Sequence, residues 1–256
     1  MSLAIETHEL TRFFDRFCAV DGIELRVERG TFYGFLGPNG AGKSTTIKML
    51  TGLLAPSRGQ VLVLGKDMRD PRESLEVKSR VGVVPEELAL FDNLTAREYL
   101  TFIGRMYLLP RDTIRTRIDE LLPLLGLEAE TKKLTLEYST GMKKKLALAA
   151  ALLPNPDLLF LDEPFEGVDA VTSRTIRDLL GGYVARGSTV FLTSHILEIV
   201  ERLCSHVGII VKGVLVEQAS LEAIRQGGSL EQHFLEMAGA DAEATRKLSW
   251  LEETAS

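Results

Sequence analysis

Cysteine is scarce in this chain of 256 residues, and the two cysteines present, Cys18 and Cys204, stand far apart. Their separation matches neither a metal-binding motif nor a redox pair. Disulfide-dense scaffolds are typical of small secreted proteins, whereas a few unpaired thiols are typical of reducing compartments. The cysteines therefore argue against a disulfide framework and favour a reducing environment.

Long apolar runs and a net positive charge are missing as well. The longest apolar run, residues 146–153, is far shorter than the roughly 20 residues that a membrane-spanning helix needs. Near the N-terminus a charge already appears at Glu6, which is too early for a signal peptide. A net charge of −6 offers no basic field that would attract nucleic acid. We expect no nucleic-acid partner, and we expect any membrane role to depend on a partner subunit.

The chain does have an alternation of short apolar strands with helical segments. Four apolar runs predict buried strands, at residues 32–36, 158–161, 189–192 and 207–211. Further strands are predicted at 25–28, 60–64 and 80–84, with a helix over 44–54 and a turn at 56–59. Strands that alternate with helices in this way indicate a parallel sheet with helices on its faces.

The middle of the chain, from about residue 94 to residue 136, is helical in pattern. Thr95 is placed to cap a helix that runs to Met106. A second amphipathic helix over 112–125 ends near Gly126. We interpret this block as a helical insertion inside an α/β domain.

A glycine-rich loop follows the strand at 32–36. Residues 37–44 fit the pattern G-x-x-x-x-G-K-[ST] at every fixed position, between a strand and a helix. Such a loop turns backbone N–H groups inward around phosphate oxygens, and the helix N-terminus adds positive potential. We expect Lys43 to reach the β- and γ-phosphates and Ser44 to offer its hydroxyl to Mg²⁺. The expected nucleotide-binding residues of this loop are Gly37, Pro38, Asn39, Gly40, Ala41, Gly42, Lys43, Ser44 and Thr45. A glycine-rich turn without a ligand is the simpler alternative.

Two carboxylates, Asp162 and Glu163, end the apolar strand at 158–161. Burying them is costly unless they face a cation or a solvated cleft. We expect Asp162 to hold Mg²⁺ through its water shell and Glu163 to orient and deprotonate the attacking water. An acidic turn after a strand is the simpler alternative for this pair taken alone.

Polar residues stand at two further element ends. His195 follows the strand at 189–192, where it can reach a γ-phosphate, although a lone histidine is most often incidental. Ser139 is a good N-cap for the helix that follows it. Because a β-branched side chain resists positive φ, we predict ordinary helical or extended dihedrals at Thr140.

Together, these residues resemble the nucleotide-binding subunit of ATP-binding cassette (ABC) transporters, over roughly residues 3–220. The stretch Ser-Thr-Gly-Met at 139–142 resembles the family signature, 167–169 resembles the D-loop, and His195 resembles the switch histidine. Phe14 stands where the family places an aromatic ring that stacks on adenine. Residues 83–87 resemble the loop that joins the core to the helical subdomain, and the branch of exporters with separate ATPase and permease chains is the most similar.

The resemblance implies a P-loop NTPase fold, with a RecA-like parallel sheet core, an antiparallel β subdomain and an inserted α-helical subdomain. The nucleotide-binding domain is expected over 1–226, with the helical subdomain at about 88–140, and a C-terminal extension over 227–256. ATP and Mg²⁺ are the implied cofactors. The implied catalytic residues are Lys43, Glu163 and His195; Ser44, Glu86 and Asp162 are the metal site; Phe14, Glu86, Ser139, Thr140, Gly141, Asp162 and Asp169 join the loop in binding the nucleotide.

The resemblance also implies that two copies stack head to tail and sandwich two ATP molecules. The loop at 37–44 of one copy and the signature of the other would close on the same γ-phosphate, toward which the signature helix points its N-terminus. This homodimer would work with an integral-membrane permease at the cytoplasmic face of the cell membrane and would power export by ATP hydrolysis.

Three positions depart from the family pattern. Thr140 replaces the first signature glycine, Ala170 replaces a usual proline, and Glu86 stands where most relatives have glutamine, although this exporter branch often has glutamate. None of these changes removes a side chain that touches phosphate, so we expect activity to survive.

Two other functions share the glycine-rich loop. A soluble ABC-type ATPase that acts on nucleic acid or ribosomes usually carries a long coiled coil or two cassettes in one chain, and this sequence has neither. A GTPase or a small-molecule kinase leaves the signature unexplained, and the guanine-reading motif Asn-Lys-x-Asp does not occur. The transported substrate is not encoded in this chain if a permease holds its site.

Overall fold

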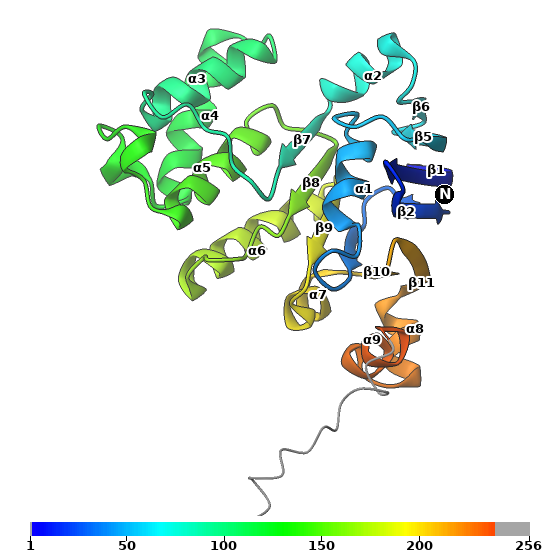
Figure 1. Cartoon of the computed structure of the whole chain (residues 1–256). Coiled ribbons are helices and arrows are strands. Elements are labelled where there is room, and N and C mark those ends of the chain that lie inside the picture. Colours follow the sequence, from blue (N-terminus) through cyan, green and yellow to red (C-terminus); the bar gives the residue numbers. More distant parts are fainter. Residues whose placement is uncertain (1, 239–256) are drawn as a thin grey trace, which may run out of the picture.

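A computed structural model describes residues 2–238 of the chain (Figure 1). The strands are β1 (Leu3–Phe14), β2 (Phe17–Ile23), β3 (Arg26–Glu28), β4 (Phe32–Leu36), β5 (Arg58–Val63), β6 (Lys66–Asp67), β7 (Val81–Val84), β8 (Leu158–Asp162), β9 (Thr189–Ser194), β10 (His206–Val211) and β11 (Val214–Ser220). The helices are α1 (Lys43–Leu50), α2 (Pro71–Lys78), α3 (Ala96–Met106), α4 (Arg111–Leu124), α5 (Thr140–Leu152), α6 (Ala170–Ala185), α7 (Leu197–Leu203), α8 (Leu221–Gly227) and α9 (Leu230–Ala238), with 3₁₀ turns at Glu128–Glu130 and Thr135–Glu137.

The strands form two sheets of different type. The larger sheet has the order β11-β10-β4-β9-β8-β7, and every neighbouring pair in it is parallel except β10 and β11. The smaller sheet has the order β2-β1-β5-β6 with β3 paired to β1, and all its pairs are antiparallel. The predicted P-loop NTPase fold, with a parallel core sheet and an antiparallel β subdomain, is confirmed.

The parallel sheet lies between two hydrophobic cores, and successive residues of its strands point into different ones. Phe32 and Leu36 of β4 belong to the core shared with helices α3 to α9, whereas Tyr33 and Phe35 belong to the core shared with α1 and the antiparallel sheet. Strands β8 and β9 divide their side chains in the same way. A sheet covered on both faces is the physical reason that these strands read as continuous apolar runs.

Two elements end or begin at other residues than the sequence predicts, in both cases because of local contacts. The helix expected over 44–54 is α1, and it ends at Leu50 because Gly52 takes a left-handed conformation (φ +69°) and Leu53 N–H donates back to Lys48 O. The turn expected at 56–59 is shorter, because Arg58 already pairs with Thr11 of β1 and so opens β5. Helices α2, α6, α7, α8 and α9 and strands β6 and β11 were not predicted.

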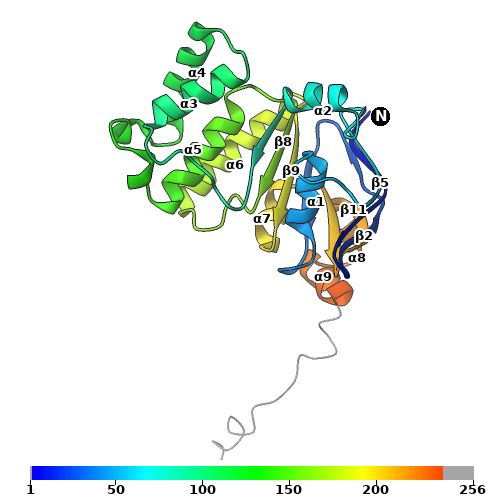
Figure 2. The same ribbon diagram turned by 45° about the horizontal axis from the view of Figure 1, so that its top comes forward.

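The helical block stands to one side of the parallel sheet (Figures 1 and 2). Helix α3 begins as predicted at the N-cap Thr95, whose hydroxyl accepts from Glu98 N while the Glu98 carboxylate accepts from Thr95 N. Helices α3 and α4 pack on one another and α3 packs on α5, whose apolar side chains lie in the core shared with the sheet. The domain boundaries at 1–226 and at about 88–140 stay predictions.

The first part of the predicted C-terminal extension is folded onto the domain. Leu230 is buried, and Phe234 packs against the same core as Ile224 of α8. Residues 239–256 of that extension lie outside the described residues. Within 2–238, no helix is both long enough and apolar enough to cross a membrane.

The aromatic cluster inside the sheet yields a stability prediction. The ring of Phe191 is fully buried and lies 5.4–5.7 Å, centroid to centroid, from the rings of Tyr33, Phe35 and Phe160. Phe191→Ala should lower the free energy of unfolding by about 3–5 kcal/mol, because it removes burial and leaves a cavity. Urea denaturation measures this. The matched control Leu75→Ala changes a side chain that is 70% exposed and should stay within about 0.5 kcal/mol; a loss below about 1 kcal/mol for Phe191→Ala would contradict this account.

Candidate functional site

The glycine-rich loop is held between β4 and α1 by close backbone packing. A Cβ atom at Gly37 would lie 2.5 Å from Ile210 O, and one at Gly42, whose φ is +108°, would lie 2.6 Å from Ala19 O. Both positions therefore require glycine. Gly213 N–H donates to Ala41 O at 3.0 Å, which ties the loop to the turn after β10. The loop is thus braced by strands from both sheets.

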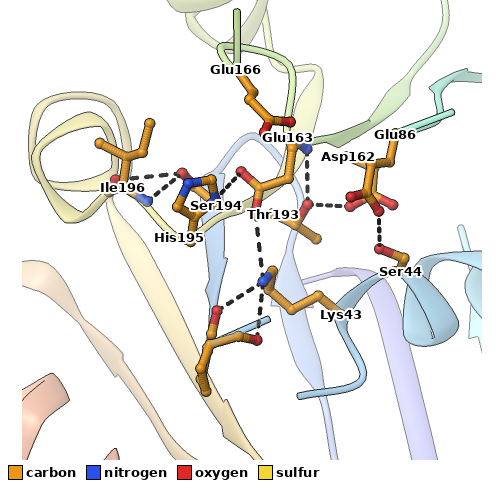
Figure 3. Close-up of polar contacts among 12 residues, drawn as sticks. Lys43, Ser44, Glu86, Asp162, Glu163, Glu166, Thr193, Ser194, His195 and Ile196 are labelled. Carbon is orange, nitrogen blue, oxygen red and sulfur yellow. Dashed lines mark hydrogen bonds and ion pairs between the residues drawn. The ribbon is translucent and has the colours of Figure 1, made fainter. Parts of the chain in front are cut away.

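Lys43 turns back into its own loop. Its Nζ donates to Gly37 O at 2.8 Å and to Pro38 O at 3.3 Å, and it lies 3.6 Å from Glu163 Oε1 (Figure 3). The side chains of Lys43 and Glu163 are each only 7% exposed. The two carbonyl oxygens and the carboxylate compensate the burial of this ammonium.

Asp162 and Glu163 share one partner from the neighbouring strand. The Thr193 hydroxyl of β9 donates to Asp162 Oδ1 and accepts from Glu163 N at 3.1 Å. Glu163 has a left-handed backbone (φ +47°), and its Oε1 has no hydrogen-bond partner among the described residues. Because an L-residue seldom adopts this conformation, the backbone of Glu163 is strained, and this conformation sets the direction in which its carboxylate points.

His195 approaches Glu163 from the carboxyl end of β9. Its Nδ1 lies 3.0 Å from Glu163 Oε2, on the opposite carboxylate oxygen from Lys43 (Figure 3). The His195 side chain is 40% exposed, whereas that of Glu163 is 7% exposed. The structure therefore brings the three expected catalytic side chains, Lys43, Glu163 and His195, into one contact chain.

The expected metal residues lie together as well. Ser44 Oγ donates to Glu86 Oε2 at 3.0 Å, and Ser44, Glu86 and Asp162 line one pocket of about 170 Å³. Oxygen donors of this kind suit a hard divalent cation. Within residues 2–238 no group of three His, Cys, Asp or Glu side chains is arranged to hold a metal unaided. The pocket therefore fits a cation that takes its other ligands from phosphate and water.

The charge state of Asp162 depends on what fills this pocket. Burial raises the pKa of Asp162, and the negative charges of Glu86 and Glu163 raise it further, while the hydrogen bond from Thr193 opposes them. A bound cation would stabilise the ionised form.

The signature residues lie elsewhere in the chain. Ser139 is the N-cap of α5, with Oγ accepting from Met142 N at 3.3 Å, and Thr140 opens the helix with an ordinary backbone, as predicted. A Cβ at Gly141 would lie 3.6 Å from Gly167 O, so the signature faces the D-loop. Asp169 caps α6 by accepting from Thr172 N and Oγ1, which lowers its pKa. Among residues 2–238, no hydrogen bond or ion pair joins these residues to the glycine-rich loop.

Phe14 lies at the end of β1, opposite Phe17 across the hairpin, and is 44% exposed. The Arg12 guanidinium covers its ring at 4.7 Å from the centroid. The same hairpin reaches the glycine-rich loop through Ala19, whose O faces Gly42.

Two residues that belong to the site were not predicted. Thr193 lies in a short polar run after an apolar strand, which is a usable signal. Lys144 of α5 donates to the backbone carbonyls of Glu163 and Glu166. It is the middle one of three consecutive lysines, and the sequence contains no signal that separates it from its neighbours.

The chain is similar to known proteins over most of its length. A family model described as "ABC transporter" matches residues 20–166. The bacitracin transport ATP-binding protein BcrA of Bacillus licheniformis is 40% identical over 227 residues, which cover 88% of this chain and 72% of BcrA. The linearmycin resistance ATP-binding protein LnrL of Bacillus subtilis is 37% identical, with 83% and 68% covered. The chain also spans 38% of a longer Escherichia coli protein, named "Probable multidrug ABC transporter ATP-binding protein YbhF", at 38% identity.

Solved structures show the same fold. The structure of an ATP-binding subunit of an ABC transporter superposes with a TM-score of 0.85 at 30% identity, covering 91% of this chain and 99% of that one. A dimeric post-hydrolysis state of the ATP-binding cassette MJ0796, bound to ADP and Pi, superposes with a TM-score of 0.79 at 23% identity, covering 85% and 98%.

The raised pKa of Asp162 makes stability depend on pH in a defined direction. In the unfolded chain this carboxyl ionises near its ordinary value of 3.8, whereas in the fold it ionises at higher pH. Ionisation therefore destabilises the nucleotide-free and metal-free protein as pH rises through the folded pKa. Asp162→Asn, which keeps an acceptor for Thr193, should raise the melting temperature at pH 7, and this gain should vanish below about pH 4. Calorimetric melts across pH measure it; the exposed control Asp178→Asn should show no such trend, and a pH-independent gain at Asp162 would contradict the assignment.

Proposed function

The chain belongs to the ABC transporter family as an ATP-binding, ATP-hydrolysing subunit, and we propose that it powers the export of a substrate through a separate permease at the cytoplasmic face of the cell membrane. The observation that carries this proposal is the contact chain Lys43–Glu163–His195 beside the oxygen-lined pocket of Asp162. The Lys43 ammonium would bind phosphate, the Glu163 carboxylate would activate water, and the pocket of Asp162 would hold a metal ion. All three lie at the carboxyl edge of one parallel sheet.

ATP binding is proposed to rearrange Lys43. Phosphate oxygens replace Gly37 O and Pro38 O as its partners, and they draw the ammonium away from Glu163 Oε1. The Glu163 carboxylate is then free to accept a proton from the attacking water. His195, which contacts the other carboxylate oxygen, holds Glu163 in place and reaches toward the γ-phosphate.

Mg²⁺ is the proposed metal, and when bound it neutralises charge on the phosphates. Ser44, Glu86 and Asp162 would hold it with phosphate oxygens and water. Oxygen ligands with few protein side chains are the usual setting for Mg²⁺ beside a nucleotide. The burial that raises the pKa of Asp162 supports a cation at this position.

The adenine is proposed to stack on Phe14. One face of this ring is covered by the Arg12 guanidinium, and the ring is 44% exposed, so a face remains for a base. A π-face accepts any purine, so we expect weak discrimination between ATP and GTP.

Two copies are proposed to sandwich two ATP molecules. Ser139, Thr140, Gly141 and Asp169 lie on exposed or half-buried surface and make no polar contact with their own chain's loop within residues 2–238. A partner copy is the simplest way to bring a signature onto a γ-phosphate. The dimeric state of MJ0796, a protein of the same fold, supports this arrangement.

The permease is proposed to dock beside the helical block. An apolar groove of about 210 Å³ is lined by Val83, Pro85, Leu88, Ala89, Leu90, Tyr99, Ile103, Tyr107, Ala147, Ala150 and Ala151. Its neighbours Phe91 and Met106 are 48% and 66% exposed. A permease segment that presents apolar side chains fits this groove, and there it would touch the loop that carries Glu86.

Export is the proposed direction, because the named relatives serve bacitracin transport and linearmycin resistance. These names also favour a transporter subunit over a soluble ATPase that acts on nucleic acid or ribosomes.

Glu163→Gln should lower kcat for ATP hydrolysis by about 10²–10⁴-fold while ATP still binds, because the amide keeps the shape but cannot accept the proton of water. An ATP-bound dimer should accumulate in size-exclusion chromatography. Glu120→Gln, on the exposed face of α4, serves as the charge-matched control and should leave kcat unchanged. Hydrolysis at the wild-type rate in Glu163→Gln would show that another group is the base.

Glu86→Gln should weaken the dependence of ATP binding on Mg²⁺. Without metal, the Glu86 charge repels the phosphates, so the variant should bind metal-free ATP about fivefold more tightly and gain less when Mg²⁺ is added. Calorimetric titration of ATP with and without Mg²⁺ measures both quantities. The matched control is Glu87→Gln, which removes the same charge from the next residue. Glu87 lines the same pocket but makes no hydrogen bond to Ser44. Equal gains in wild type and Glu86→Gln would mean that Glu86 is a solvated loop residue.

A further inference from the structure

We propose that Lys144 is a positioning residue for the catalytic carboxylate, an inference that rests on the proposed role of Glu163 as the base. Lys144 lies on α5, two residues after the signature, and is not among the residues that line the pocket that would hold the metal. It acts on the backbone of the turn that carries Glu163.

The contacts of Lys144 are those of a built cation site. The residue is 9% exposed, and its Nζ donates to Glu163 O at 3.1 Å and to Glu166 O, while Glu166 Oε2 lies 3.7 Å away. Burying an ammonium is costly unless its N–H groups are satisfied. The two carbonyl acceptors lie at the two ends of the Glu163–Glu166 turn, so the cation closes this turn.

The turn has little else to hold it. Its own backbone hydrogen bond, Glu166 N to Glu163 O, is long at 3.3 Å, and the hydrogen bond of the next turn, Val168 N to Phe165 O, is equally long. Pro164 has no N–H to contribute. The strained backbone of Glu163 (φ +47°) therefore needs support from outside the turn.

That support comes from both sides of Glu163. Thr193 of β9 accepts from Glu163 N at 3.1 Å, and Lys144 of α5 donates to Glu163 O at 3.1 Å. With its N–H and its C=O both held, the residue has little freedom to rotate, and its carboxylate stays between Lys43 and His195. The Thr193 contact comes from the sheet, whereas the Lys144 contact comes from α5, the helix that follows the helical block.

The neighbouring lysines do not share this role. Lys143 has a side chain that is 30% exposed and reaches only to 4.0 Å from Asp92. Lys145 lies beside Gly126, and its positive charge helps to lower the pKa of Asp169. Lys144 therefore links helix α5 to the turn that carries the proposed catalytic base Glu163 of the same chain. In the proposed dimer, the N-terminus of that same helix, at Ser139, points at the partner's nucleotide.

Lys144→Met keeps the side-chain length and removes the donor. In the full chain with Mg²⁺ and ATP, kcat should fall about 10–100-fold, because a displaced catalytic group costs rate steeply. The Kd for ATP, measured by calorimetry, should stay within about twofold. Lys143→Met, which removes the same charge from the preceding residue, should keep the wild-type kcat.

The double variant Lys144→Met/Glu163→Gln separates positioning from a general structural role. If Lys144 acts through Glu163, the double variant should hydrolyse ATP no more slowly than Glu163→Gln and should still form the ATP-bound dimer. Losses that multiply, or loss of the dimer, would overturn the inference. Wild-type kcat in Lys144→Met beside an inactive Glu163→Gln would also overturn it and leave the proposed base intact, whereas an active Glu163→Gln would overturn the proposed role of Glu163 as the base.

A thermal melt checks that each variant folds. If Lys144→Met does not fold, Lys144→Gln carries the same test, because its amide keeps one N–H donor for a carbonyl. Its kcat should fall by a smaller factor, about 3–10-fold, with the same absence of further loss in the Glu163→Gln background. An unchanged kcat in a folded Lys144→Gln variant, with Lys144→Met unable to fold, would mean that the residue only stabilises the fold.

Discussion

The buried contact between Lys43 and Glu163 is the interaction around which the site is built. Each side chain is 7% exposed, so each charge depends on partners inside the protein. Gly37 O and Pro38 O compensate the ammonium, and His195 approaches the free side of the carboxylate. The site thus holds a cation and an anion together, and in the proposed function a phosphate group that binds Lys43 would release the carboxylate.

Keeping two such charges in place requires a rigid frame, and the parallel sheet supplies it. The paired strands β4, β9 and β8 end together, so their carboxyl ends deliver the loop, the histidine and the two carboxylates to one edge. Hydrophobic cores cover both faces of these strands. Because packed interiors resist deformation, the strand ends that carry these residues are held in fixed positions, and the proposed change on ATP binding is confined to the partners of the Lys43 side chain.

The two segments that connect the helical block to the sheet, the loop after β7 and helix α5, each make a polar contact with this frame. At the first, Glu86 follows β7 and accepts from Ser44 of the glycine-rich loop. At the second, Lys144 of α5 holds the carbonyls of the Glu163–Glu166 turn. Both contacts are polar and lie in or beside the site, whereas the helical block itself contacts the sheet through apolar packing and a hydrogen bond from Tyr107 Oη to Val81 O of β7. A movement of the loop after β7 would therefore act on the pocket lined by Ser44, Glu86 and Asp162, and a movement of α5 would act on the turn that carries Glu163.

The sequence alone determined the features that depend on local chemistry. Apolar runs identified the buried strands, and Thr95 and Ser139 marked helix starts. The β-branched side chain of Thr140 predicted that this residue has ordinary backbone dihedrals. The glycine-rich loop could be identified because its glycines stand at close backbone contacts that few other residues tolerate. Only the tertiary structure decided how Lys43, Glu163 and His195 meet, that Thr193 bridges Asp162 and Glu163, and that Lys144 rather than Lys143 turns inward. Those contacts join residues that are far apart along the chain, and strand pairing and helix packing, which no local pattern encodes, bring them together.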